Sequence, residues 1–238
     1  MRRWMSAQGP AEGAQADPLE GLNPEDVTWD AVRERGELSD HDLGEIQASA
    51  IAPHVALARG YRTVRKRPEL ERLGFSPGKC RIPSLLIPWH TLTVEKRSYQ
   101  IKPRVSPLED GEPKKYLCQA GMSNHLDVSP LIREWIKDPL YPVWFTEGIK
   151  KTDAAISQRL CCIGLNGVFG WRGKNELGGP QALADFEQVP LNRKVYLAFD
   201  SDCESNRQVH EALRRFRGFL ASKGADVWFV SLPSQADE

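Results

Sequence analysis

Three carboxylates follow two apolar segments of the sequence and are the residues best suited to chemistry. Glu147 ends the run that begins at residues 143–145, and Asp200 and Asp202 follow the run 194–199. If both runs are parallel strands of one sheet, these side chains share an edge, because ligands bind beyond the carboxyl ends of such strands. Clustered carboxylates repel one another unless a cation lies between them, and Mg²⁺ prefers oxygen ligands. The spacing therefore favours a Mg²⁺ site, with Mn²⁺ as an alternative ion, that could stabilise the charge of phosphoryl transfer.

Each acid taken singly also has a structural explanation. An Asp after a strand often caps the helix that follows, and Asp202 could cap a helix that begins near Ser205. The occurrence of acids at two corresponding strand ends favours the metal site over this alternative.

The elements that would position these acids begin at residue 141. Apolar runs predict four strands, at residues 143–146, 160–165, 194–199 and 226–232. A helix is expected over residues 149–159, and an amphipathic helix between the last two strands is predicted by the apolar spacing of Val209, Ala212, Leu213, Phe216 and Leu220. Strands that alternate with helices predict a central parallel sheet flanked by helices, an α/β fold.

The glycine-rich segment 164–179 lies between the second and third of these strands. It is expected to be either a mobile flap over the site or a plain surface loop. A short helix is predicted to follow it, over residues 180–186.

The first half of the chain has a different pattern of predicted elements. Residues 1–22 predict a flexible tail, and Asn23 followed by Pro24 predicts the start of a helix that runs to Arg35. Short strands separated by turn residues are expected after residue 83, at residues 84–89, 91–94, 98–102 and 116–118. The predicted organisation is therefore a tail (1–22), a helical preface with a small basic α+β subdomain (23–139), and the α/β domain (140–238).

Charge is distributed unevenly, although the net charge is zero. Residues 59–115 contain 14 Lys and Arg against 6 Asp and Glu, whereas residues 1–58 contain 4 against 11. The basic middle segment indicates an anion-binding surface, with a merely solvated basic face as the alternative.

Composition excludes several classes of protein. No apolar run approaches the about 18 residues of a membrane-spanning helix, and the start lacks the apolar core of a signal peptide. The five Cys form no CxxC pair, which argues against a disulfide framework or a zinc ribbon and fits a reducing cytoplasm. No GxxxxGK[ST] loop is present, so this chain is not itself a helicase.

The pattern of strand, TEG, helix, then strand, glycine loop, strand, DSD and helix resembles the Toprim domain of bacterial primases, topoisomerases and nucleases. The resemblance implies that Glu147 is a general acid or base and that Asp200 and Asp202 bind Mg²⁺. Together with TEGxKK and DSD, the upstream YQ-x-x-x-R and KKY elements most resemble the Toprim-like domains of unknown function in phage, plasmid and other mobile-element replication proteins. The third acidic element usual in the family is missing before the chain ends at Glu238, so a truncated C-terminus is expected.

Basic and polar residues around these motifs are expected to bind nucleotide or template. Two lysines follow Glu147 near a helix N-terminus, where backbone N–H groups also attract phosphate. The predicted nucleic-acid-binding or nucleotide-binding residues are Arg104, Lys114, Lys115, Asn124, Lys150 and Lys151.

Three functions are carried forward from the sequence. The first is a primase-like, Mg²⁺-dependent nucleotidyltransferase that acts on single-stranded DNA in replication of a mobile element, with a replication helicase or a fused ATPase domain as partner. The second is a Toprim nuclease that uses the same metal. The third is a non-catalytic module that binds DNA or docks a helicase through the basic segment.

Overall fold

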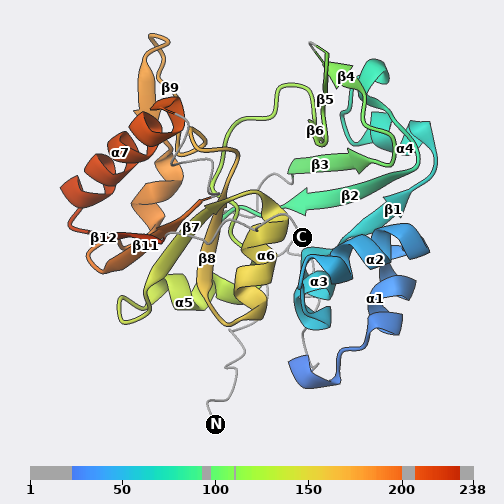
Figure 1. Cartoon of the computed structure of the whole chain (residues 1–238), viewed down its shortest axis with the longest axis horizontal. Coiled ribbons are helices and arrows are strands. Elements are labelled where there is room, and N and C mark those ends of the chain that lie inside the picture. The colour runs from blue at the N-terminus through green and yellow to red at the C-terminus, as the bar shows by residue number, and fades with distance from the viewer. Residues whose placement is uncertain (1–22, 93–97, 110, 200–206, 231–238) are drawn as a thin grey trace, which may run out of the picture.

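The structure is a computed structural model that describes residues 23–92, 98–109, 111–199 and 207–230. The chain forms two lobes, each built on a four-stranded sheet (Figure 1). The predicted tail at residues 1–22 lies outside the described residues, as do Asp200 and Asp202.

The first lobe contains α1 (Trp29–Gly36), α2 (Asp40–Ala48), α3 (Pro53–Arg59), β1 (Arg62–Val64), α4 (Arg67–Arg72), β2 (Ser84–Trp89), β3 (Ser98–Pro103), β4 (Leu108–Glu109), β5 (Glu112–Pro113) and β6 (Leu117–Cys118). The second contains α5 (Arg133–Lys137), β7 (Val143–Glu147), α6 (Ile149–Ser157), β8 (Cys161–Leu165), β9 (Arg172–Lys174), β10 (Pro180–Ala182), β11 (Lys194–Ala198), α7 (Arg207–Ser222) and β12 (Asp226–Val230). Short 3₁₀ helices occupy Pro24–Asp26, Pro77–Lys79, Pro130–Ile132 and Ala184–Gln188.

The sheet of the second lobe is parallel throughout, with the strand order β12-β11-β7-β8. Successive side chains of a strand point to opposite faces. On one face Phe145 of β7 contacts Phe216 of α7 edge to face, and on the other face Gly164 of β8 lies against Thr152 of α6. The two helices therefore cover opposite faces, which confirms the predicted α/β fold class with a parallel sheet flanked by helices.

The sheet of the first lobe is antiparallel, with the order β1-β2-β3-β6. All six residues of β2 are buried, because both faces of this strand are covered. Leu85 and Ile87 belong to a core that extends through both lobes, whereas Leu86 belongs to a smaller cluster that includes Leu70 of α4. The shared core joins the helical preface, the basic region and the parallel sheet into one folded body.

Two predictions in the first half of the chain were wrong in detail. The helix expected to run unbroken to Arg35 is split after Asp26, because the Thr28 hydroxyl accepts a hydrogen bond from the amide of Ala31 and starts α1 as a new N-cap. Asn23 does cap the first turn as predicted. The strand expected over residues 91–94 is absent at Thr91 and Leu92, and residues 93–97 lie outside the described part.

The glycine-rich segment contains a hairpin that the sequence did not predict. β9 and β10 pair antiparallel, with Arg172 opposite Ala182. The short helix expected over residues 180–186 is therefore wrong at Pro180–Ala182, and a 3₁₀ helix begins only at Ala184. At the tip of the hairpin, the side-chain oxygen of Asn175 accepts hydrogen bonds from the backbone amides of Leu177 and Gly179. This local turn reverses the chain and brings Pro180 into pairing instead of helix initiation.

Cys161 and Cys162 are buried in β8, and burial raises the pKa of the Cys161 thiol to about 12. Within the residues that the structure describes, no helix is both long enough and apolar enough to cross a membrane.

Candidate active site

Glu147 occupies the carboxyl end of the central strand β7, between β11 and β8. It stands opposite Leu165, the last residue of β8, whose carbonyl accepts the amide of Gly148 at 3.0 Å. Gly148 has φ +82°, a left-handed conformation that favours glycine and that lets α6 begin directly after the strand. The turn therefore holds the Glu147 carboxylate at the edge where ligands bind in parallel sheets.

The acids of the DSD element follow the neighbouring strand. β11 pairs with β7 through Leu197 opposite Phe145, so the two strands end at the same edge of the sheet. Asp200 comes next after Phe199 in the sequence, but the predicted ligands Asp200 and Asp202 lie outside the described residues.

The fit of a divalent cation rests on this placement. Among the described residues, no group of three or more His, Cys, Asp or Glu side chains is close enough to hold a metal ion. The one predicted ligand that the structure describes, Glu147, is a partly exposed carboxylate at the correct edge, with 34% of its side chain accessible. Oxygen donors of this kind suit Mg²⁺. The neighbouring strand β11, which Asp200 and Asp202 follow in the sequence, ends at the same edge as β7.

The two lysines after Glu147 have different partners. Lys151, in the first turn of α6, has its Nζ 3.7 Å from Oε1 of Glu147. Lys150 instead binds Glu45 of α2 through a 2.6 Å contact. Only Lys151 is therefore brought next to Glu147.

Glu45 joins the two lobes beside this site. Its Oε1 lies 2.7 Å from Nζ of Lys102 in β3 and 2.6 Å from Nζ of Lys150 in α6. Burial raises the pKa of Glu45, but the hydrogen bonds from the two lysines outweigh it, so the net shift is downward. The ionised carboxylate thus ties the basic strand β3 to the helix that begins at the candidate site.

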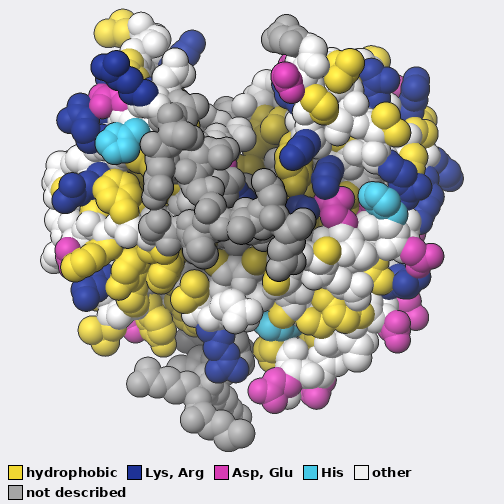
Figure 2. Space-filling model, in the orientation of Figure 1, with side chains coloured by type: hydrophobic (Ala, Val, Ile, Leu, Met, Phe, Trp, Pro, Cys, Tyr) yellow, Lys and Arg dark blue, Asp and Glu magenta, His cyan; other side chains and the backbone are white. Residues whose placement is uncertain are grey.

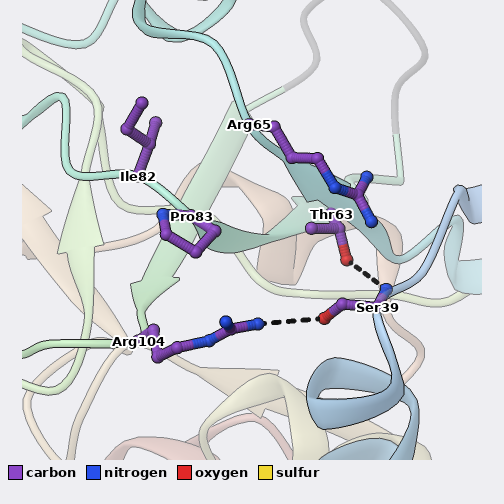
Figure 3. A pocket seen from close by; sticks show the side chains of 6 residues that line it. All are labelled: Ser39, Thr63, Arg65, Ile82, Pro83 and Arg104. Atoms are coloured by element: carbon purple, nitrogen blue, oxygen red, sulfur yellow. Dashed lines mark hydrogen bonds between the residues drawn. The ribbon is translucent and has the colours of Figure 1, made fainter.

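Arg104 lies further along the basic region, in an open pocket of about 320 Å³. Its Nη2 is 3.3 Å from Oγ of Ser39, the N-cap of α2. Figure 3 shows this guanidinium and that of Arg65 on two sides of the pocket, with Ile82 and Pro83 on another. The pocket therefore combines two cations with an apolar wall, and Arg104 follows closely after Lys102 in the chain.

The lysines of the KKY element lie at and just beyond the small β4–β5 hairpin. Lys114 pairs with Glu109 of β4, so the charge of Lys114 is partly neutralised. Lys115 is exposed, and no carboxylate within the described ranges pairs with it. Over this lobe, Lys and Arg side chains gather along the rim of the molecule (Figure 2).

Asn124 connects two segments at the carboxyl edge of the parallel sheet. Its side-chain oxygen accepts Nδ2 of Asn166 at 3.2 Å, and its own Nδ2 lies 3.4 Å from the carbonyl of Arg172. Asn166 directly follows Leu165, the partner of Glu147. Asn124 is therefore close to the candidate site, and it holds the β9–β10 hairpin there.

Sequence reasoning missed a buried ionic network behind the site. Arg59 of α3 binds Asp127 with both Nη atoms, at 2.7 and 2.8 Å, and binds Asp153 of α6 through Nε and Nη2. All three side chains are fully buried. The hydroxyl of Tyr61 donates to Asp153 at 2.8 Å, and the amide of His90 donates to Asp127 at 3.0 Å.

Electrostatics explain how this network is tolerated. Burial lowers the pKa of Arg59, but the two carboxylates raise it by more, so the guanidinium stays charged. Burial also raises the pKa of Tyr61, and the neighbouring Asp153 raises it further, so the phenol stays a donor. One signal was available in the sequence: Asp153 shares the apolar helical face of Ile149 and Ile156, where an acid must be paired.

Comparisons with known proteins identify the fold. Among curated proteins, no sequence matches significantly. Residues 133–238 match a family described as a domain of unknown function (DUF3854). Solved structures give the more informative likeness, and three primase structures illustrate it.

The Aquifex aeolicus primase (zinc-binding and RNA polymerase domains) is similar with a TM-score of 0.57 and 16% identity, over 91% of this chain and 58% of that one. The DnaG primase catalytic domain bound to single-stranded DNA has a TM-score of 0.53 and 12% identity, over 83% of this chain and 65% of that one. The E. coli primase catalytic core has a TM-score of 0.52 and 12% identity, over 93% of this chain and 72% of that one. At these identities the likeness is one of fold: the chain has the fold of DnaG-type primase cores and spans 58% of the first of these chains.

Proposed function

We propose that this protein is a primase-like nucleotidyltransferase that acts on single-stranded DNA and depends on Mg²⁺. The observation that carries the proposal is the position of Glu147 at the carboxyl edge of the parallel sheet, in a fold shared with primase cores. A basic lobe joined to this edge through the Lys102–Glu45–Lys150 contacts supports it.

Glu147, Asp200 and Asp202 would hold the divalent cation, with Mn²⁺ able to replace Mg²⁺. The cation would neutralise charge on the phosphates of the incoming nucleotide. The requirement for it follows from the chemistry of the donor set, since three carboxylates that shared one site would need a positive charge between them.

The residues of the chain would perform the remaining steps. The 3′-hydroxyl oxygen attacks the α-phosphorus, the new O–P bond forms, and pyrophosphate leaves with the electrons of the broken bond. Glu147 would accept the proton of the attacking hydroxyl. Lys151, 3.7 Å from Glu147, would attract the phosphates, and Arg104 and Lys115 would hold template or triphosphate.

The finer context of this activity is also a proposal. Residues 133–238 match a domain family without an assigned function, and the resemblance of TEGxKK and DSD to mobile-element replication proteins supports a role in replication of such an element. A helicase, separate or fused as an ATPase domain, would supply the single-stranded template.

The test is template-directed synthesis by the purified protein on single-stranded DNA with ribonucleotides and Mg²⁺. Synthesis should occur and should be lost in Glu147→Gln, while Glu134→Gln on the exposed face of α5 should remain active. Unchanged synthesis in Glu147→Gln would overturn the proposal. Metal-dependent cleavage without synthesis would identify a nuclease, and salt-sensitive DNA binding without either reaction would identify a binding module.

A further inference from the structure

The turn between β8 and the β9–β10 hairpin carries an exposed aromatic side chain, shortly after Leu165, the strand partner of Glu147. Phe169 is 42% exposed, although Trp171, two residues later, is buried and stacks on Phe216 and Phe219 of α7. Because Trp171 supplies the anchor of the hairpin, packing in the core does not explain Phe169.

The position of this turn is closely fixed. A Cβ on Gly170 would lie 2.6 Å from the backbone nitrogen of Asn166, so the two backbones are in direct contact. The amide of Gly170 donates to the carbonyl of Gly167 at 2.9 Å. The backbone next to Phe169 is therefore held against Asn166, which follows Leu165, the strand partner of Glu147.

The guanidinium of Arg172 lies over the Phe169 ring. The guanidinium of Arg172 lies 4.9 Å from the centre of the Phe169 ring and 5.8 Å from that of Trp171. Among the described residues, no carboxylate pairs with Arg172 or with Lys174, the next basic residue of β9. Asn124 contacts the carbonyl of Arg172 and so keeps this strand at the sheet edge.

The surroundings indicate which partner this surface fits. In Figure 1 the β9–β10 hairpin and the β4–β5 hairpin rise from the two lobes on the same side of the molecule. An exposed ring with a stacked guanidinium binds the face of a nucleobase irrespective of its identity, and nearby cations bind the backbone phosphates.

We propose that Phe169 and Arg172 form a platform for one base of single-stranded nucleic acid at the carboxyl edge of the parallel sheet, with Lys174 contacting the adjoining backbone. This inference rests on the proposed function for the identity of its ligand as a single strand. The platform itself requires no metal and no catalysis. It would hold the strand beside Glu147 and leave the base sequence unread.

Binding of a fluorescent oligodeoxythymidine to the full chain in EDTA tests the platform apart from the chemistry. Phe169→Ala and Phe169→Leu should each weaken binding by about 5- to 150-fold, the range expected from loss of one aromatic–base stack, and Phe169→Trp should retain the binding. Arg172→Ala should weaken binding and reduce its dependence on salt. Leu177→Ala, at the 95% exposed tip of the same hairpin, should bind as the unchanged protein does.

A second readout locates the base directly. An oligonucleotide that carries 5-iododeoxyuridine should photo-cross-link to the peptide that contains Phe169. Equal binding by Phe169→Leu and the unchanged protein, with cross-links elsewhere, would overturn the platform and leave the proposed synthesis intact. If poly-glutamate displaced the oligonucleotide at equal charge concentration, the surface would bind acidic peptides and the inference would be wrong. Loss of synthesis in the assay above with cross-linking to Phe169 preserved would refute only the catalytic proposal.

Discussion

Arg59 of α3 and Asp153 of α6 form a fully buried ion pair in which Nε and Nη2 of the guanidinium both contact the carboxylate, Nη2 at 2.5 Å and Nε at 2.9 and 3.1 Å. α6 begins directly after Glu147 and Gly148. The pair therefore attaches the helix that follows the candidate catalytic residue to the helical preface, some ninety residues earlier in the chain.

The first prediction concerns this network. Arg59→Met removes the cation between Asp127 and Asp153 and leaves two buried carboxylates without a counter-charge. Loss of one partner from a buried pair is expected to cost about 3–5 kcal/mol of unfolding free energy, measured by urea denaturation at neutral pH. Arg59→Lys keeps the charge but cannot reproduce the forked contact with both acids, so it should be destabilised less.

Arg33→Ala is the matched control for that substitution. Arg33 pairs with Asp40 at the surface, where the two side chains are 46% and 87% exposed, and its loss should change stability little. Equal effects of the Arg33 and Arg59 substitutions would contradict the role assigned to the buried network.

The second prediction concerns pH. The pKa of Glu45 is lowered below its ordinary value of 4.5 by Lys102 and Lys150, despite the opposing effect of burial. A carboxyl with a lowered folded-state pKa contributes stability that is present above the unfolded pKa and is lost as the pH falls through the folded one. The stability difference between the unchanged protein and Glu45→Gln should therefore shrink as the pH falls from about 6 to about 3.

Urea midpoints across that pH range provide the measurement. Glu134→Gln serves as the control, since its partner Lys137 is 69% exposed and screened by solvent. If the stability difference between the unchanged protein and Glu45→Gln stayed constant over this pH range, the two lysines would not stabilise the ionised form of Glu45.

The third prediction concerns the contact between β8 and α6. A Cβ on Gly164 would lie 2.6 Å from Oγ1 of Thr152 and 3.1 Å from Cβ of Asp127. Gly164→Ala should therefore cost about 1–3 kcal/mol through overpacking. By contrast, Gly44 of α2 has no atom within 4 Å of an added Cβ, and Gly44→Ala should stabilise the protein by about 0.5–1 kcal/mol. If the unfolding midpoints of Gly164→Ala and Gly44→Ala shifted in the same direction, the close contact between β8 and α6 would be contradicted.

Much of the second lobe could be predicted from the sequence. Strands such as residues 143–146 are short apolar runs between turn residues, and α7 carries a regular apolar stripe that ends in the buried Phe216 and Leu220. Such local patterns suffice when the sheet and its helices alternate along the chain. The same logic placed Glu147 at the carboxyl edge.

The missed features depend on contacts between distant segments. Nothing local to Arg59 reveals that its partners are Asp127 and Asp153, and the pairing of Lys150 with Glu45 joins residues 105 apart. The β9–β10 hairpin was missed for a different reason. Its turn is formed by the Asn175 side chain, and glycines on both sides obscured the strand pattern.

The central claim is that Glu147 shares one divalent cation with the two acids that follow β11. Titration of Mn²⁺, followed by the loss of its free-ion paramagnetic resonance signal, tests this most directly in the full chain. We predict that Glu147→Gln, Asp200→Asn and Asp202→Asn each weaken Mn²⁺ binding by about tenfold or more, whereas Glu134→Gln binds as the unchanged protein does. Mn²⁺ binding that is unaffected by Glu147→Gln would contradict the account.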